Sequence, residues 1–424
     1  MSSFLSDSIE LINQGTYGCI FKPGMNCKGG IEKEGFITKL QYDQETTQNE
    51  VDISKILLNN DNDSDHDLNL NKKKEYEKRF APILDSCSIS LGLINEKHDF
   101  IKKCNVLKEN ALANKFYSNR IRYVGKYTLV DYFSNLMKDF DSKKRITKYL
   151  FIRACSKFHL YLLESVLLLK EKKIIHFDLK ENNILIDQKL NVPVIIDFGL
   201  SINMDPLLKK PIDSYLYTKT FYVYYDKYPP WCLEIVLVSF IVNSVSSVDS
   251  IWGGEKPRIR KPKQMKENTV DWTTLSVKKE DLLLIVDHYF EENPVIKMIS
   301  LNIRQEKKEK WINWIREIYT DKKTTMHSMI MVNKLIESWT TWDTFGLSVI
   351  FFMLLHKFVL VPDKLSKYQY IIIENMLAIP PERKGAEDLK KTLYDNFHSP
   401  NAIKENNIWT WNRNRNRNLG YSNV

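Results

Sequence analysis

Short apolar runs alternate with glycines from Ile9 to about Leu40. This pattern is typical of hairpins in a small antiparallel sheet, because glycine allows tight turns between strands. From Thr47 to Leu58 the apolar residues recur at helical spacing instead. The sequence therefore predicts a small sheet with one helix leaning on it.

Later parts of the chain favour helices. After strand-like segments between about Phe80 and Val130, a long Leu-rich helix is predicted from Lys148 to Lys172. The most apolar run, Phe345–Leu355, is shorter than the roughly 20 residues that a membrane span needs. We interpret it as a buried helix and expect no membrane span.

Composition indicates a globular protein. The 424 residues are enough for two or three lobes, since domains commonly hold about 100 to 200 residues. A hydrophobic content of 43% can build a packed interior, which excludes a wholly disordered chain. Lys and Arg outnumber Asp and Glu by 62 to 53, a net charge of +9, but these charges are dispersed. Acidic partners are favoured, and no specific nucleic-acid partner is predicted.

The six cysteines are scattered, and no two form a C-x-x-C pair. We therefore expect neither a zinc site nor a disulfide framework, and a reducing compartment fits this pattern. The first residues, M-S-S-F-L-S-D-S-I-E, lack the basic and apolar regions of a secretory signal. A cytoplasmic location is the resulting expectation.

The stretch Asn59–Asp67 resembles a calcium loop, because aspartate stands at every second position. However, His66 stands where such a loop needs glycine, and Lys72 stands where it closes with glutamate. A solvated loop is favoured, and calcium is not predicted.

The strongest chemical signal is I-I-H-F-D-L-K-E-N-N-I-L-I at Ile174–Ile186, followed by V-I-I-D-F-G-L. Phosphoryl transfer to a hydroxyl needs a carboxylate for the hydroxyl proton and a divalent metal to neutralise phosphate charge. Either motif alone would occur by chance, whereas both in order make coincidence the weaker explanation. They resemble the catalytic loop and the metal-binding segment of protein kinases.

This resemblance implies a protein kinase and assigns roles within the segment His176–Gly199. Asp178 matches the catalytic base, while Asn183 and Asp197 match the two residues that hold magnesium. Lys180 matches the residue that contacts the transferring phosphate in serine/threonine kinases, so Ser or Thr is the expected acceptor. The implied cofactors are ATP and Mg, and the implied partner is a protein substrate.

An N-terminal motif extends the resemblance. I-N-Q-G-T-Y-G-C-I-F, at Ile12–Phe21, is similar to the kinase Gly-rich loop, whose backbone amides cover the nucleotide phosphates. Gly15 and Gly18 match two of its glycines, while Asn13 replaces the first. Lys39 matches the strand lysine that holds the α- and β-phosphates.

That lysine needs a carboxylate on the neighbouring helix. Glu50 is the expected partner, because the apolar residues after it place it on the sheet-facing side, and Glu45 is the alternative. The family positions around the adenine are Ile12, Ile20, Ile37 and Leu185, with a hinge at Tyr123, Val124 and Gly125. Ordinary core packing would explain these apolar residues equally well.

Downstream motifs continue the resemblance. In W-D-T-F-G-L, Asp343 matches the acid that clamps the catalytic-loop backbone. In I-P-P-E-R-K-G, Arg383 matches the buried arginine of the closing kinase motif, with Glu234 as its expected partner.

The chain departs from the family at Phe177, where many regulated kinases have an arginine that pairs with a phosphorylated activation loop. Activation by loop phosphorylation is therefore in doubt, and constitutive or partner-driven activity is favoured. The activation segment, Asp197–Glu234, is rich in tyrosine, and either Thr218 or Thr220 matches the threonine that bonds the catalytic Asp and Lys. The sequence does not choose between them.

The resemblance implies an α+β, bilobal protein-kinase-like fold. A small β-rich N-lobe is expected over residues 1–125 and a mainly helical C-lobe over 126–400, with a helical insertion at about 244–338 and a low-complexity tail at 401–424. The long insertion and the Asn- and Lys-rich composition are similar to kinases of large nucleocytoplasmic DNA viruses, which implies the host cytoplasm or the virion.

Two alternatives stay open. A pseudokinase or scaffold of the same fold would lack one of Lys39, Asp178, Asn183 or Asp197, and all four are present. A small-molecule kinase of the same superfamily shares part of the catalytic loop, but Lys180 and the Arg383 motif argue against it. The oligomeric state is not predicted.

Overall fold

The computed structural model describes residues 10–15, 18–24, 35–42, 44–58, 74–89, 103–106, 116–138, 145–243, 258–259, 272–319, 324–358, 366–400 and 402. The calcium-like stretch 59–67 and most of the tail 401–424 lie outside these residues. The chain divides into two compact units. The first holds Met1–Tyr132 and Asn182–Ser201, and the second holds Phe133–Glu181 and Ile202–Val424.

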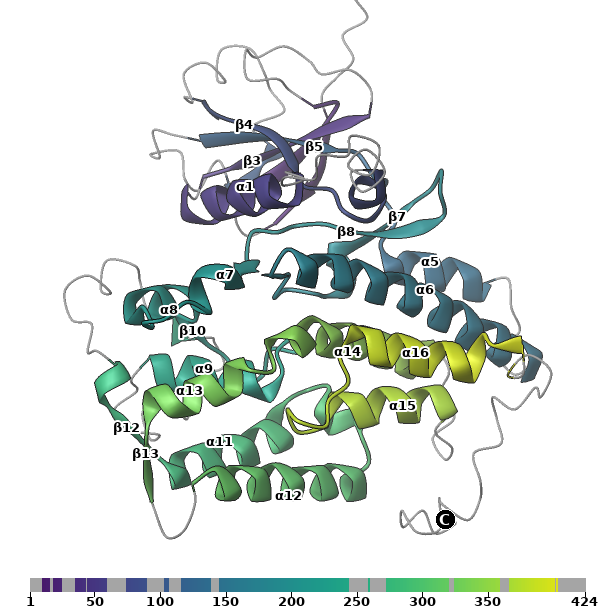
Figure 1. Ribbon diagram of the computed structural model, residues 1–424. Helices are drawn as coiled ribbons and strands as arrows, with labels where there is room; N and C mark the ends of the chain where they lie inside the picture. The colour runs from purple at the N-terminus through teal and green to yellow at the C-terminus, as the bar shows by residue number, and fades with distance from the viewer. Residues whose placement is uncertain are drawn as a thin grey trace, which may run out of the picture. The chain divides into compact units, whose positions relative to one another are not determined.

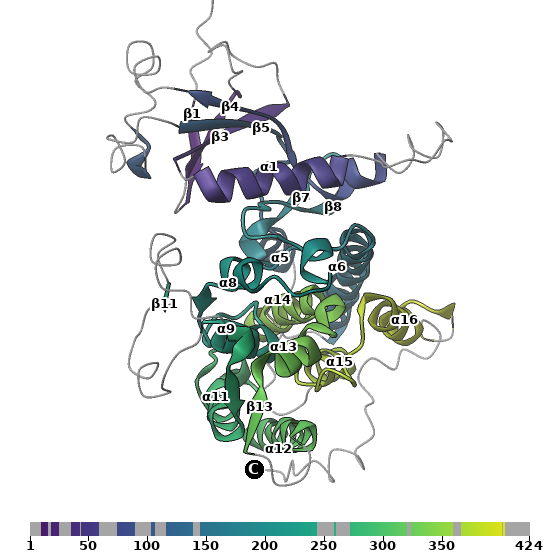
Figure 2. The same ribbon diagram turned by 60° about the vertical axis from the view of Figure 1, so that its left-hand side comes forward.

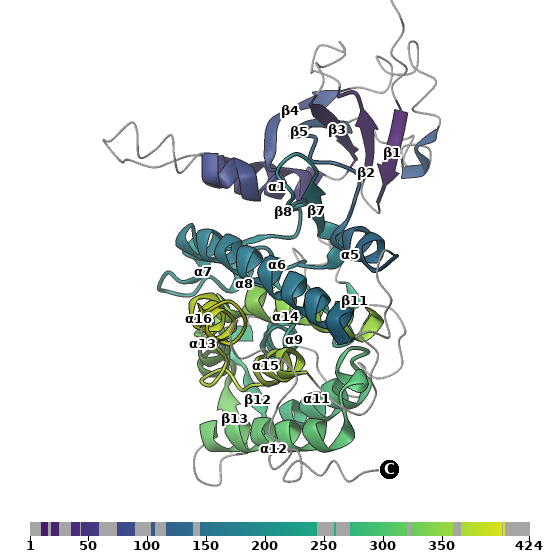
Figure 3. The same cartoon turned by 90° about the vertical axis from the view of Figure 1, so that its right-hand side faces the viewer.

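The first unit is built on a five-stranded antiparallel sheet (Figure 1), whose strand order β1-β2-β3-β5-β4 can be followed in Figure 3. Its strands are β1 (Glu10–Gln14), β2 (Gly18–Lys22), β3 (Phe36–Gln41), β4 (Ile83–Ile89) and β5 (Phe116–Arg122). Helix α1 (Gln44–Leu58) lies against the sheet (Figure 2) and buries Ile53 and Leu57. The predicted small sheet with one helix is confirmed. A hairpin of β7 (Ile184–Asp187) and β8 (Val192–Ile195) belongs to the same unit.

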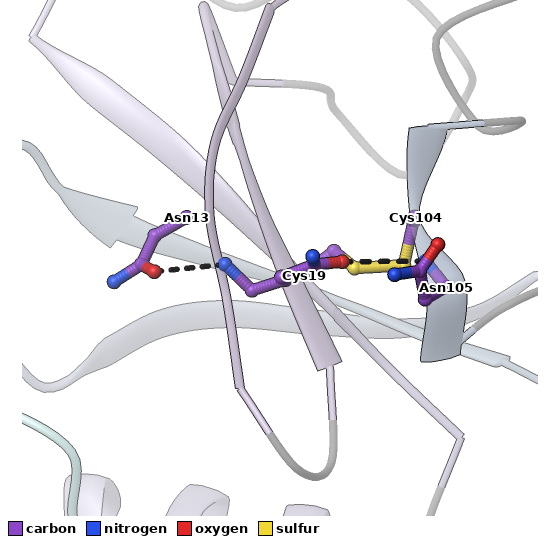
Figure 4. Close-up of a disulfide and its surroundings, with 5 residues drawn as sticks. Asn13, Cys19, Cys104 and Asn105 are labelled. Atoms are coloured by element: carbon purple, nitrogen blue, oxygen red, sulfur yellow. Dashed lines mark hydrogen bonds between the residues drawn. A yellow bond between two sulfur atoms is a disulfide. The ribbon is translucent and has the colours of Figure 1, made fainter.

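A disulfide in this unit corrects the expectation drawn from cysteine spacing. Cys19 of β2 is bonded to Cys104, and their Cα atoms lie 6.1 Å apart (Figure 4). Cys87 is also disulfide-bonded. The Asn105 N–H donates to Gln14 Oε1 at 3.3 Å, which holds the same segment to β1. The expectation of no disulfide is wrong because Cys19 and Cys104 stand 85 residues apart, and only tertiary folding brings them together.

The second unit is mainly helical and is centred on α14 (Trp342–Phe358), most of whose residues are buried. Helix α6 (Arg145–Glu171) lies beside α14 and α16 (Ala386–Phe397), while α15 (Lys367–Met376) packs on α14 (Figure 3). The predicted buried helix over Phe345–Leu355 is confirmed. Of the helices in the described part of the chain, none has the length and apolar character that a membrane crossing requires.

Shorter elements complete the two units. From the start of the catalytic motif to the insertion these are β6 (Ile174–Ile175), η2 (Glu181–Asn183), β9 (Ile202–Asn203), α7 (Met204–Leu207), α8 (Ser214–Thr220), β10 (Val223–Tyr224) and α9 (Leu233–Val242). Helix α5 (Leu129–Lys138) follows β5, and η6 (Trp339–Thr341) precedes α14.

The insertion at 244–338 holds helices of its own, as expected. Its described elements are β11 (Arg258–Ile259), η4 (Trp272–Thr274), β12 (Ser276–Lys278), α11 (Lys279–Glu292), η5 (Ile296–Met298), α12 (Leu301–Ile318), β13 (Thr325–His327) and α13 (Ser328–Ile336). Helices α11 and α12 lie side by side (Figures 1 and 3), and Lys308 of α12 pairs with Asp287 and Glu291 of α11. The insertion also contains a stretch rich in Lys and Arg at 256–266, of which the structure describes only 258–259.

Candidate active site

Lys39 lies within β3, opposite Ile20 of β2 and Asn119 of β5. Its Nζ lies 2.8 Å from Glu50 Oε2 and 2.9 Å from Asp197 Oδ1. We call Lys39, Glu50 and Asp197 the Lys39 cluster. The Lys39 and Glu50 side chains are 13% and 4% exposed, whereas Asp197 is 43% exposed. The Glu50 carboxylate is therefore buried inside the unit, whereas the Asp197 carboxylate lies at its surface.

Electrostatics keep the Lys39 ammonium charged. Burial by itself would lower the pKa of Lys39, but attraction by Glu50 and Asp197 outweighs it and raises that pKa. Burial raises the pKa of Glu50 against the opposing attraction of Lys39. Because an unpaired buried carboxylate would be strongly destabilising, the ion pair is what allows Glu50 to lie inside the unit. Glu45, the alternative partner, is exposed.

Helix α1 also holds the backbone that follows Asp197. Asp197 itself has a left-handed backbone with φ 66°, an uncommon conformation that is concentrated at functional sites. Asn49 Nδ2 donates to the carbonyl oxygens of Gly199 at 3.0 Å and Ser201 at 2.9 Å. One turn of α1 therefore supplies both the partner of Lys39 and the support of the Asp197 segment. Sequence reasoning missed Asn49, although its place beside Glu50 is a signal.

Asn183 and Asp197 lie at the same end of the β7–β8 hairpin. Asn183 directly precedes β7, Asp197 follows β8, and the antiparallel register pairs Ile184 with Ile195. The Asn183 carbonyl accepts a hydrogen bond from the Ile196 N–H at 3.0 Å, which extends this pairing. The hairpin therefore brings together the two residues that the resemblance assigns to magnesium.

The donor set of this pair fits magnesium. Within the described residues, no group of three or more His, Cys, Asp or Glu could hold a metal by itself. Magnesium is commonly bound by one or two protein carboxylates together with substrate phosphates and water. The carboxylate of Asp197 and the amide oxygen of Asn183 match that incomplete protein shell.

The apolar residues expected around the adenine fall into two groups. Ile37 and Leu185 pack against a buried cluster that includes Val124. Ile12 of β1 is 42% exposed and Ile20 of β2 is partly buried. Two of the four residues, Ile37 and Leu185, therefore share one cluster, while Ile12 lies on the edge strand β1.

The expected hinge follows the end of β5. The Tyr123 N–H donates to the Gly35 carbonyl at 2.8 Å, so this amide is used within the protein. Gly125 has φ 152°, and a Cβ there would lie 3.0 Å from the Ile186 carbonyl oxygen. Ile186 N–H in turn donates to Tyr127 at 2.9 Å. Only glycine fits this close approach of the hinge to β7.

The two glycines of the N-terminal motif have different surroundings. A Cβ at Gly18 would collide with the Leu40 carbonyl oxygen, so the approach of β2 to β3 requires glycine there. A Cβ at Gly15 would meet nothing within 4 Å. The described protein atoms therefore give no steric reason for Gly15, whose N–H donates to the Gly18 carbonyl at 2.9 Å.

Asp178, in the second unit, is buried and has two side-chain partners. Lys180 Nζ lies 2.9 Å from Asp178 Oδ2, and the Tyr228 hydroxyl donates to Asp178 Oδ1. The same lysine nitrogen lies 3.5 Å from the Tyr228 oxygen. We call Asp178, Lys180 and Tyr228 the Asp178 cluster.

Tyr228 corrects the expectation that Thr218 or Thr220 contacts Asp178 and Lys180. Thr218 Oγ1 donates to the Ser214 carbonyl at 2.9 Å, and Thr220 Oγ1 donates to the Leu216 carbonyl at 2.8 Å. Both threonines bond to the preceding turn of α8, as threonines in helices commonly do. The position of Tyr228 shortly before Glu234 could have pointed to it.

The backbone around Asp178 is held by α14 and by aromatic side chains. Asp343 accepts hydrogen bonds from the N–H groups of His176 at 2.7 Å and Phe177 at 3.2 Å, as expected. Phe177 has φ 67°, and Trp231 Nε1 donates to its carbonyl at 3.0 Å. The Phe177 ring lies 4.9 Å from that of Trp231 and 6.1 Å from that of Phe221. Phe177 is therefore packed among aromatic side chains, at the position where the family resemblance would place an arginine.

Comparison with known proteins gives a match to part of the chain. The family model for the protein kinase domain matches residues 93–223. This part includes Asp178 and Asp197 and leaves out Lys39 and Arg383. The match supports the protein kinase superfamily and suggests phosphotransfer activity with ATP and a protein substrate. No curated protein matches the chain.

Proposed function

We propose that the chain is an ATP-dependent serine/threonine protein kinase with the bilobal kinase fold. The Lys39 cluster is the observation that carries this proposal. A structural ion pair needs only one acid, whereas Lys39 contacts both buried Glu50 and partly exposed Asp197, which stands 158 residues away in sequence. A fixed lysine beside an exposed carboxylate is what a metal–phosphate site requires.

The residues of the first unit are assigned to the nucleotide. Glu50 orients Lys39 towards the α- and β-phosphates, and the backbone near Gly15 leaves room for phosphate oxygens. Asn183 and Asp197 would hold magnesium, which neutralises phosphate charge when it is bound. Ile37 and Leu185 would contact the adenine.

The residues of the second unit are assigned to the acceptor. Asp178 takes the proton from the acceptor hydroxyl, whose oxygen forms the new bond to the γ-phosphorus as the bond to the β-phosphate oxygen breaks. Lys180, beside Asp178, stabilises negative charge on the transferring group. The lysine at this position favours Ser or Thr over Tyr by resemblance to serine/threonine kinases.

A transfer assay tests this function. The full chain, with Mg and ATP labelled in the γ-phosphate, should label a generic basic protein or itself, and phosphoamino-acid analysis should give phosphoserine or phosphothreonine. Asp178→Asn should abolish the label. Asp205→Asn, which changes an acid that is 41% exposed and paired with Lys173, should retain it. Equal incorporation by wild type and Asp178→Asn would contradict the catalytic assignment.

Other outcomes select the alternatives. Nucleotide binding without transfer to any acceptor would indicate a pseudokinase or scaffold. Transfer to aminoglycoside or choline-type acceptors alone would indicate a small-molecule kinase. Phosphotyrosine alone would contradict the acceptor class while leaving phosphotransfer in place.

The origin of the chain is a further part of the proposal. The long insertion and the Asn- and Lys-rich composition support a kinase of a large DNA virus that acts in the host cytoplasm. The Cys19–Cys104 disulfide bears against a reducing compartment, because cytosolic thiols are normally kept reduced. Alkylation of thiols at the moment of cell lysis, followed by peptide mapping, would show whether Cys19 and Cys104 are bonded or reduced in the cell, and so whether the compartment is oxidising or reducing.

A further inference from the structure

Helix α11 of the insertion contacts the segment 226–231, which carries Tyr228. His288 Nδ1 is hydrogen-bonded to Asp226 Oδ2. One residue further along, the Tyr289 hydroxyl donates to the Trp231 carbonyl at 2.8 Å. The helix therefore contacts both ends of the segment, and its own position is secured by the Lys308 contacts with α12.

Additional contacts join the insertion to the same region. Asn293 Nδ2, just after α11, lies 3.5 Å from the Asp226 carbonyl oxygen. Lys227 lies 3.7 Å from Glu292. In η4, Trp272 Nε1 donates to the Ser214 carbonyl of α8 at 3.1 Å. The insertion thus contacts the activation segment at two separate places.

Inside the segment 226–231, short contacts lead from α11 to Asp178. The Trp231 N–H donates to the Tyr228 carbonyl at 3.1 Å, and the two rings lie edge to face with centroids 5.1 Å apart. Trp231 also donates to Phe177, the neighbour of Asp178. Any shift of the segment would therefore move both the Tyr228 hydroxyl and the backbone beside Asp178.

We propose that α11 acts as a brace, which means that it holds the segment 226–231 in place and thereby positions the Asp178 cluster. It holds the segment 226–231 so that the Tyr228 hydroxyl stays on Asp178 and Lys180, and activity does not require phosphorylation of the activation segment. His288 and Tyr289 are positioning residues that act through Tyr228. This inference rests on the proposed function and names the regulation of the same site.

The surroundings of Tyr228 favour positioning over blockage. Its ring is held between Tyr225, stacked at 6.1 Å, and Trp231, and its hydroxyl contacts both Asp178 and Lys180. A hydroxyl that contacts both the Asp178 carboxylate and the Lys180 ammonium fixes the orientation of these two groups. Pre-organised sites retain their geometry through such contacts. Phe177 has no charged group that could bind a phosphate on the activation segment. The brace therefore orders this segment in the way that phosphorylation would otherwise do.

Two variants of α11 test the brace, with a matched control on the same helix. His288→Ala and Tyr289→Phe should each lower the kcat for protein acceptor by about threefold to tenfold, the value of one lost hydrogen bond. The KM for ATP should stay within about twofold, because the lost contact lies near the Asp178 cluster and leaves the binding of ATP unchanged. Glu280→Gln, which changes an exposed acid in the first turn of α11, should retain the wild-type kcat.

A double-mutant cycle tests whether the brace acts through Tyr228. Tyr228→Phe should lower kcat, and adding Tyr289→Phe to it should cost much less than the same change costs alone. Additive effects would overturn the positioning role, since a purely structural residue would act independently. A rise in acceptor turnover on Tyr228→Phe would overturn it as well, because Tyr228 would then be blocking the acceptor.

Hydrogen exchange gives a readout that does not depend on activity. Exchange within residues 226–231 should accelerate in His288→Ala and Tyr289→Phe and stay unchanged in Glu280→Gln. Unchanged exchange in both brace variants would overturn the brace, whatever the assay gives. Wild-type protein treated with phosphatase should retain its kcat, and loss of activity on this treatment would also overturn it. Absence of any transfer by wild type would instead contradict the proposed function.

Discussion

Arg383 and Glu234 form a doubly hydrogen-bonded ion pair in the core of the second unit. Nη1 lies 2.6 Å from Oε1 and Nη2 lies 3.0 Å from Oε2. The two side chains are 1% and 0% exposed. Glu234 precedes the insertion and Arg383 follows it, so the pair ties α9 to the C-terminal helices across the inserted segment. The ion pair expected from the closing motif is confirmed.

Loss of either partner should strongly destabilise the second unit. Glu234→Gln or Arg383→Met leaves one charge buried without its partner, which costs about 3 to 5 kcal/mol. Chemical denaturation of the full chain should show this as a lower midpoint. Lys384→Ala, next to Arg383 but exposed, should change stability by less than about 0.5 kcal/mol. Equal effects of the Arg383 and Lys384 variants would contradict the structural role of the pair.

Glu50→Gln should impair phosphotransfer while the fold is retained. Removing the carboxylate charge frees Lys39 from its fixed position, and we expect kcat/KM to fall by about tenfold to a hundredfold. Glu45→Gln is the matched control on α1, because Glu45 is exposed. Steady-state kinetics with varied ATP would measure both. Similar losses in the two variants would indicate that helix charge, and not the Lys39–Glu50 pair, controls activity.

Cys104→Ser should lower the stability of the first unit. The disulfide closes a loop across a sequence separation of 85 residues, and the chain-entropy model gives about 4.5 kcal/mol for a loop of this size. Denaturation under non-reducing conditions would measure the difference, and peptide mapping without reductant would identify the Cys19–Cys104 pair. A wild-type chain whose stability equals that of Cys104→Ser under these conditions would show that the bond contributes nothing.

Acid should destabilise the second unit through His159. Its ring is stacked on Phe351 at 4.3 Å, and burial lowers its pKa to about 3. The unfolded chain takes up this proton near pH 6.5, so stability is complete above that pH and falls as the pH drops towards about 3. Between pH 7 and pH 5 the loss should be about 2 kcal/mol. Urea denaturation at both values would measure it, and a His159→Gln variant with an undiminished pH difference would exclude His159 as the cause.

The sequence by itself determined the elements and the order of the chemical motifs. Apolar periodicity is local, so it predicted the sheet, helix α1 and the buried α14 from neighbouring residues alone. The order of the motifs also predicted the Lys39–Glu50 and Arg383–Glu234 pairs, because the residues that they match in the family are known to contact each other. In both pairs the structure places the charged atoms in contact.

Only the tertiary structure decided which individual side chains meet between elements. The Cys19–Cys104 bond, the Tyr228–Asp178 hydrogen bond and the His288–Asp226 contact join residues 85, 50 and 62 positions apart. No local pattern encodes such contacts, because they depend on how the elements pack and on which face each side chain occupies. From the sequence, the insertion is only an addition of unknown role. In the folded chain its helix α11 contacts the segment 226–231, which carries the Tyr228 that bonds Asp178.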